Sequence, residues 1–231
     1  MKKTLRPVLT AAAALVMLCA LVIGTLASGA QNVSDDPADS YVKQTAANED
    51  SSISLWFEHS FKKVLTSDTT PSGMDTYSVY MAKNEIENAQ FVLYSDTDKT
   101  GMKAEVTAFS AMDGSVAAIP SELYYEMYVS TEGIDPTAYL GYDPENPVIR
   151  AGETPDPVAP MKRVKTFKLN GGKSQAFFIK LRSAADTPAG WYSAQLDIKN
   201  SAGEVVKTAT VYAHVWDFAL SEKTALQTAF Y

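Results

Sequence analysis

The stretch Trp191-Tyr192-Ser193-Ala194-Gln195-Leu196-Asp197-Ile198 decides the fold class of this chain. Positions 192, 194, 196 and 198 carry apolar or aromatic side chains, and positions 193, 195 and 197 carry polar ones. This period of two is typical of a β-strand with one buried face. Turn residues follow at 200–203, and a return strand runs from Val205 to Phe218. The sequence therefore predicts an antiparallel hairpin.

The same alternation recurs through the chain from Ser52 onward. It is present in the stretches 53–57, 77–81, 91–93, 104–108, 123–129 and 177–181. Gly, Pro, Asn and Asp separate these stretches, and none of them has the periodicity of an amphipathic helix. Together they predict an all-β fold, an antiparallel β-sandwich of about eight strands over residues 52–220.

The first thirty residues have the composition of a secretory signal peptide. Basic residues at positions 2, 3 and 6 precede an apolar run from Val8 to Ala27, and small residues at 27–30 offer a cleavage site. We predict cleavage after Ala30 and a secreted or cell-surface location. The apolar run is also long enough to span a membrane if it stays uncut, so a membrane tether is an open alternative.

Composition limits the classes of partner. The formal net charge is −7, and loss of residues 1–30 with their three basic residues would make it −10, which argues against nucleic acid and anionic membrane surfaces. Neutral polysaccharide remains compatible. The single cysteine, Cys19, lies in the predicted signal peptide, which excludes disulfides and cysteine-ligated metals from the mature chain. Residues 31–51 are polar and acidic, and predict a disordered linker.

The segment 130–163 departs from the strand pattern. It holds six of the eleven prolines, and its length predicts a long loop. Such a loop is either ordered against another surface or a solvated insertion, and the sequence leaves both open.

The sequence offers few candidates for catalytic residues. His59 and His214 are the only histidines, too few for a triad or a histidine-rich metal site, and Glu85 and Glu87 are too close to form a water-activating pair. We therefore predict no catalytic, cofactor-binding or metal-ligating residue. Exposed aromatic rings stack on the apolar faces of sugars. The candidate glycan or interdomain contacts are Trp56, Tyr139, Tyr142, Asp156 and Trp216.

Four stretches resemble the N-terminal β-sandwich of glycoside hydrolase family 123 proteins. They are Thr187-Pro188-Ala189-Gly190-Trp191-Tyr192 with the later Val215-Trp216-Asp217-Phe218-Ala219-Leu220, the segment Asn84 to Gln90, and Pro155 to Pro160. Asn84 stands where glycine is common in such proteins, and Ser221 where proline is common.

The resemblance implies a non-catalytic sandwich that supports a C-terminal (β/α)₈ catalytic barrel. Residues 221–231 would then be the truncated start of that barrel, and the parent activity would be hydrolysis of a glycosidic bond, with an N-acetylhexosamine as the sugar. No catalytic residue of the family corresponds to a position in this chain. The alternative is a stand-alone carbohydrate-binding or cell-surface structural module.

Overall fold

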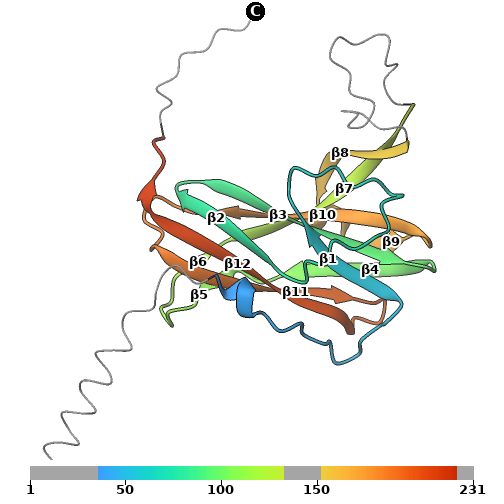
Figure 1. The fold of residues 1–231 in the computed structure, drawn as a ribbon, viewed down its shortest axis with the longest axis horizontal. Helices are drawn as coiled ribbons and strands as arrows, with labels where there is room; N and C mark the ends of the chain where they lie inside the picture. The colour runs from blue at the N-terminus through green and yellow to red at the C-terminus, as the bar shows by residue number, and fades with distance from the viewer. Residues whose placement is uncertain (1–35, 133–151, 223–231) are drawn as a thin grey trace, which may run out of the picture. The chain divides into compact units, whose positions relative to one another are not determined.

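The computed structural model describes residues 36–132 and 152–222 and confirms the all-β sandwich (Figure 1). These residues form twelve strands in two sheets, more than the predicted eight or so. The strands are β1 (Ile53–Glu58), β2 (Tyr77–Lys83), β3 (Ile86–Ser95), β4 (Lys99–Val106), β5 (Phe109–Ala111), β6 (Ala118–Ile119), β7 (Ser121–Thr131), β8 (Gly152–Pro160), β9 (Phe167–Leu169), β10 (Lys173–Arg182), β11 (Gly190–Lys199) and β12 (Val205–Ala219). Two short helices, η1 (Pro37–Ser40) and α2 (Met161–Val164), lie outside the sheets.

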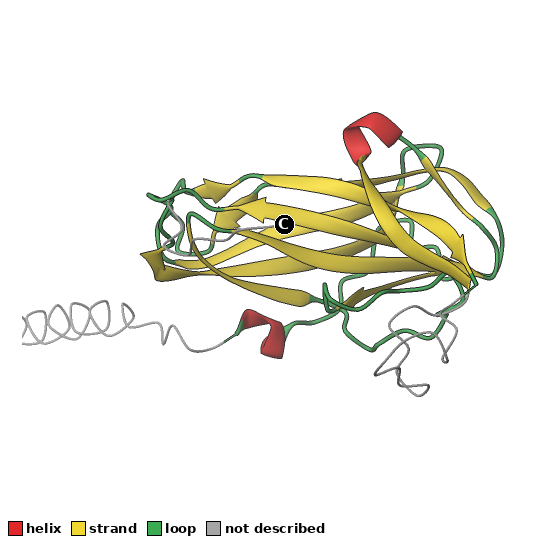
Figure 2. Cartoon of the chain, turned by 90° about the horizontal axis from the view of Figure 1, so that it is seen from above, coloured by secondary structure: helices red, strands yellow, loops and turns green. Residues whose placement is uncertain are grey.

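The two sheets form the two layers visible in Figure 2. The first sheet has the order β1-β3-β10-β7-β8 and is antiparallel throughout. The second has the order β2-β12-β11-β4-β9, with β5 and β6 attached to β11. Its one parallel pair is β2 with β12.

The apolar positions of the strands meet between the layers. In the first sheet Phe91 and Phe177 stack with ring centroids 4.8 Å apart. In the second sheet the predicted hairpin is confirmed, since Leu196 of β11 pairs with Ala209 of β12 and both are buried. A fully buried large apolar side chain contributes about 1.5–3 kcal/mol, so this core is the main source of stability in a chain without disulfides.

The proline-rich segment 130–163 is not a single long loop. Its end forms β8 and α2, and β8 pairs with β7 at the edge of the first sheet. A proline has no N–H to donate, and an edge strand needs no donor on its outer side, so Pro155, Pro157 and Pro160 are tolerated there. The prediction of a loop is therefore wrong for residues 152–163, and residues 133–151 lie outside the described residues.

An N-terminal strap, residues 36–50, lies on the outer face of the second sheet. Asp36 accepts hydrogen bonds from Ser78 at 2.5 Å and Tyr80 at 2.7 Å, and Gln44 donates to Thr210 at 3.0 Å. Sequence analysis predicts a disordered linker as far as Ser51. The structure instead fixes residues 36–50 to the sheet, because their partners come from β2 and β12, which are adjacent only in the folded protein.

The remaining predictions concern Asn84 and the two ends of the chain. Asn84, between β2 and β3, has a φ of +60°, in the left-handed region of backbone conformations. Glycine adopts this region most easily and asparagine also tolerates it, so asparagine can stand here in place of the glycine that is common in the resembling proteins. Within residues 36–132 and 152–222 no helix is long and apolar enough to cross a membrane. The predicted signal peptide, with its alternative as an anchor, and most of the segment 221–231 lie outside the described residues.

Candidate binding surface

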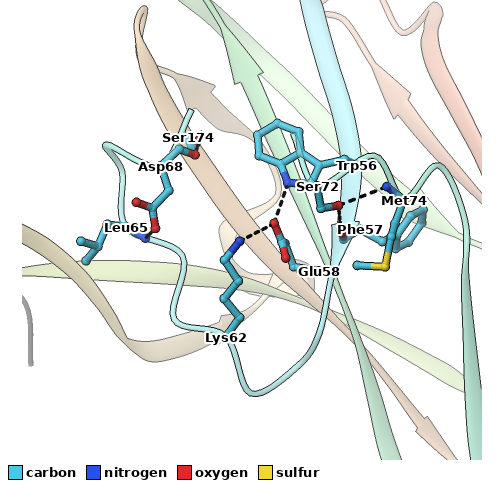
Figure 3. A network of polar contacts seen from close by, with 9 residues as sticks. All are labelled: Trp56, Phe57, Glu58, Lys62, Leu65, Asp68, Ser72, Met74 and Ser174. Carbon is cyan, nitrogen blue, oxygen red and sulfur yellow. Dashed lines mark hydrogen bonds and ion pairs between the residues drawn. The ribbon is translucent and has the colours of Figure 1, made fainter. Parts of the chain in front are cut away.

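Trp56 is not available as a ligand contact. It lies on the outer face of the first sheet, where the connection from His59 to Thr76 covers it (Figure 3). Its indole N–H donates to Glu58 at 3.2 Å, and Lys62 donates to the same carboxylate oxygen at 2.7 Å. Because the ring is buried and its donor is already bonded, the structure removes Trp56 from the candidate glycan contacts.

The other candidates are not gathered in one place. Tyr139 and Tyr142 lie outside the described residues. Asp156 is exposed on β8, in the first sheet, whereas Trp216 lies on β12, in the second. Asp156 and Trp216 therefore cannot be parts of one site on a single sheet face.

Trp216 belongs to an aromatic cluster on the outer face of the second sheet, made of Tyr80, Trp191, His214 and Trp216. His214 of β12 pairs in register with Tyr80 of β2 and with Trp191 of β11. The His214 ring lies 4.7 Å from the Trp191 ring and 4.3 Å from the Trp216 ring. Above it, the rings of Tyr80 and Trp216 stack at 5.9 Å with an interplanar angle of 24°, and these side chains are 47% and 43% exposed. The result is an aromatic pair open to solvent over a buried imidazole.

His214 has an unusual environment for an imidazole. It is 2% exposed, and neither ring nitrogen has a hydrogen-bond partner. Burial lowers the pKa of His214 below its ordinary value of 6.5, although the negative charge of Asp36 acts in the opposite direction. The ring is therefore neutral at pH 7, and the nearby Trp191 indole N–H is likewise buried without a partner.

A second feature, the acidic cleft, lies between the strap and β2. Asp36, Asp39, Asp75, Tyr77 and Tyr80 are among the residues that line its volume of about 430 Å³. Burial alone would raise the pKa of Asp36, but hydrogen bonds from Ser78, Tyr80 and the Ala38 amide outweigh it and lower the pKa. Burial, the bond to Asp36 and the charges of Asp36 and Asp39 raise the pKa of Tyr80 to about 12. At neutral pH the cleft therefore presents the ionised carboxylate of Asp36 beside the protonated hydroxyl of Tyr80.

One further buried carboxyl group lies in the first sheet. Glu126 on β7 is 4% exposed, and its Oε2 has no partner. Burial raises the pKa of Glu126 to about 7, and the charge of Lys63 opposes that rise. Among the described residues no three His, Cys, Asp or Glu side chains are placed to hold a metal ion.

The sequence contained partial indications of this surface. Tyr80 alternates with Val79 and Met81, and Trp191 precedes the buried Tyr192, so alternation assigns both aromatic residues to the outer face. Asp36 had no such indication. Its contacts with β2 depend on the path of the strap across the sheet, which local sequence does not encode.

Fold and site together define an all-β sandwich with one exposed aromatic face beside an acidic cleft. A family 123 glycoside hydrolase from Clostridium perfringens, solved to study glycolipid glycan hydrolysis, is similar in fold, with 11% identity and a TM-score of 0.52. The match covers 73% of this chain and 28% of the hydrolase, so this chain spans well under half of that protein.

Other solved structures are less similar. A Niemann-Pick type C2 protein from the Japanese carpenter ant has 9% identity and a TM-score of 0.33, with 76% of this chain and 100% of that chain covered. AvmM, which catalyses macrocyclization in alchivemycin A biosynthesis, has 11% identity and a TM-score of 0.33, with 80% and 99% covered. No family model and no curated protein matches the sequence. The comparisons therefore establish that this chain shares the fold of one part of the hydrolase.

Proposed function

We propose that this chain is a non-catalytic β-sandwich of an exported, glycoside-hydrolase-like protein, and that it supports a catalytic domain acting on glycans. The observation that carries the proposal is the fold similarity to a family 123 glycoside hydrolase of which the match covers 28%. In that enzyme a sandwich of this kind is one part of a larger molecule, and the same arrangement is the simplest role for this domain.

The end of β12 would provide the contact with the catalytic domain. Trp216, Phe218 and Leu220 are large apolar side chains at alternate positions, and all three are exposed. The strand extends past its last pairing with β11 at Val215, and Leu220 donates a backbone hydrogen bond to Lys83 at 2.9 Å. A rigid, apolar strand end is a suitable support for a neighbouring domain, because its side chains lose little conformational freedom on contact.

The reading frame beyond codon 231 tests this proposal most directly. A frame that continues into several hundred barrel-like residues supports it. The longer protein should then hydrolyse chromogenic N-acetylhexosaminides, and the 231-residue chain should not. A stop codon directly after Tyr231 contradicts the supporting role.

A second function, carbohydrate binding by the domain itself, is favoured by the stacked and exposed Tyr80 and Trp216. Aromatic faces of this kind stack on the C–H faces of sugar rings. Affinity electrophoresis on a panel of polysaccharides tests it. We expect Trp216→Ala to abolish retardation, and Phe61→Ala, which removes a ring that is 99% exposed on the covering connection of the first sheet, to leave it unchanged.

Export is tested separately. N-terminal sequencing of the protein recovered outside the cell should begin at Gln31. A protein that retains residues 1–30 in the membrane fraction would instead support a membrane tether.

A further inference from the structure

Tyr80 joins the exposed aromatic pair to the acidic cleft. Its ring stacks on Trp216 at 5.9 Å, and its hydroxyl donates to Asp36 at 2.7 Å. Since Tyr80 also lines the cleft, a ligand that lies across this ring reaches the carboxylates at the same time. The two features are therefore adjoining parts of one surface.

The charge of the cleft is strongly one-sided. Asp36, Asp39 and Asp75 line it together with one ammonium group, that of Lys43. Lys43 pairs with Asp75 at 2.5 Å, which leaves Asp36 and Asp39 without a cationic partner among the described residues. Asp39 is exposed, in the first turn of η1. The surface is therefore complementary to a positive charge, in a protein whose net charge is already −7.

We propose that this surface binds an amino sugar in its protonated form, that is, a 2-amino-2-deoxypyranose unit of a deacetylated amino-sugar polymer. The pyranose ring stacks on Tyr80 and Trp216, and its ammonium group pairs with Asp36 and Asp39. This inference rests on the second proposed function, carbohydrate binding, and specifies the sugar class. Neutral sugars retain the stacking but lose the ion pair, and anionic sugars are repelled.

The buried His214 is a second observation that favours a polar ligand here. Its ring centroid lies 4.3 Å from that of Trp216 and 6.0 Å from that of Tyr80, and both of its nitrogens lack partners. An unpaired buried polar group costs about 1–3 kcal/mol. His214 is 2% exposed, so a sugar hydroxyl would supply the missing hydrogen bond only when the Tyr80 and Trp216 rings move apart on ligand binding.

Calorimetric titration of the 231-residue chain with two tetrasaccharides tests the proposal. One consists of four glucosamine units and the other of four N-acetylglucosamine units, both at about pH 6 in low salt. We expect the glucosamine tetrasaccharide to bind at least about tenfold more tightly, and its affinity to fall as salt is raised. Trp216→Ala should remove most of the binding, and Asp39→Asn should weaken it by about threefold or more.

Matched controls separate this site from general attraction to an acidic protein. Phe61→Ala removes an exposed ring elsewhere, and Glu204→Gln removes one negative charge at the β11–β12 turn, at the opposite end of these strands from Trp191 and Val215. Both should bind like the wild type. Spermine, a cation without a sugar ring, should bind more weakly and should not respond to Trp216→Ala.

The outcomes are distinct. Equal binding of the acetylated tetrasaccharide overturns the amino-sugar proposal but leaves carbohydrate binding intact. Binding that Glu204→Gln weakens as much as Asp39→Asn also overturns it. Absence of binding by both tetrasaccharides overturns the amino-sugar proposal. If the domain still binds a polysaccharide in affinity electrophoresis, carbohydrate binding stands with another sugar class, and if it binds none, carbohydrate binding is overturned as well. Because Asp39 is exposed, Asp39→Asn keeps the test valid even if Trp216→Ala fails to fold.

Discussion

Replacing Glu126 with glutamine should stabilise this protein at alkaline pH and change little at acidic pH. The Glu126 carboxyl is 4% exposed with one oxygen unpaired, and burial raises its pKa to about 7 from an ordinary 4.5. A carboxyl whose pKa is raised in the folded state favours folding when protonated. Its contribution is fully present below about pH 4.5 and is lost as the pH rises through about 7.

The magnitude follows from the same two values. The difference between 4.5 and about 7 corresponds to about 3 kcal/mol of unfolding free energy lost between acidic pH and about pH 8. Glutamine is similar in shape to the protonated acid and does not ionise. Urea unfolding of the wild type and Glu126→Gln, followed across this pH range, should give unfolding free energies that agree near about pH 4 and differ by about 3 kcal/mol near about pH 8.

The control is Glu204→Gln, which removes a charge at an exposed turn and should show no such divergence. Equal destabilisation of Glu126→Gln at both pH values would refute the reasoning, because it would mean that Glu126 is ionised and paired in the folded protein. Lys63→Met should raise the pKa of Glu126 further, since the Lys63 charge lowers it.

Three further outcomes are expected. His214→Phe removes two buried nitrogens that lack partners. As the pH is lowered past about 6.5, the unfolding free energy of the wild type should decrease and that of His214→Phe should not, because the lowered pKa of His214 disfavours protonation in the folded state. Urea titrations near about pH 5 and pH 7 compare the two proteins. Gly171→Ala should cost about 1–3 kcal/mol in thermal unfolding, because its new Cβ would lie 2.8 Å from the Asp96 carbonyl oxygen. Phe177→Ala should cost about 3–5 kcal/mol in urea unfolding, because the ring is buried against Phe91.

Local alternation was sufficient to predict the sandwich. The period of two at Tyr192, Ala194, Leu196 and Ile198 reports directly which face of a strand is buried, because successive side chains point to opposite sides of a sheet. In β12 the same rule puts Trp216 on the outer face, opposite the buried Val215. It failed for β8, where three prolines indicate a loop, because the sequence does not show that the strand lies at an edge.

Burial by distant segments could not be predicted. Trp56 lies on an outward position of β1, yet the connection that follows covers it, with Glu58 and Lys62 around its indole N–H. Composition predicts a linker at residues 36–50, because they are polar and contain few large apolar side chains. Its order comes from hydrogen bonds to Ser78, Tyr80 and Thr210, far away in the sequence.

The sequence by itself therefore determined the class of fold and the hairpin of β11 and β12, because both depend on patterns within a few residues. Only the tertiary structure decided the candidate site. The parallel pairing of β2 with β12 brings Tyr80 beside His214 and Trp216, and the strap brings Asp36 to Tyr80. These contacts join residues up to 136 positions apart in separate segments, from Tyr80 to Trp216, and no local pattern records which segments will meet.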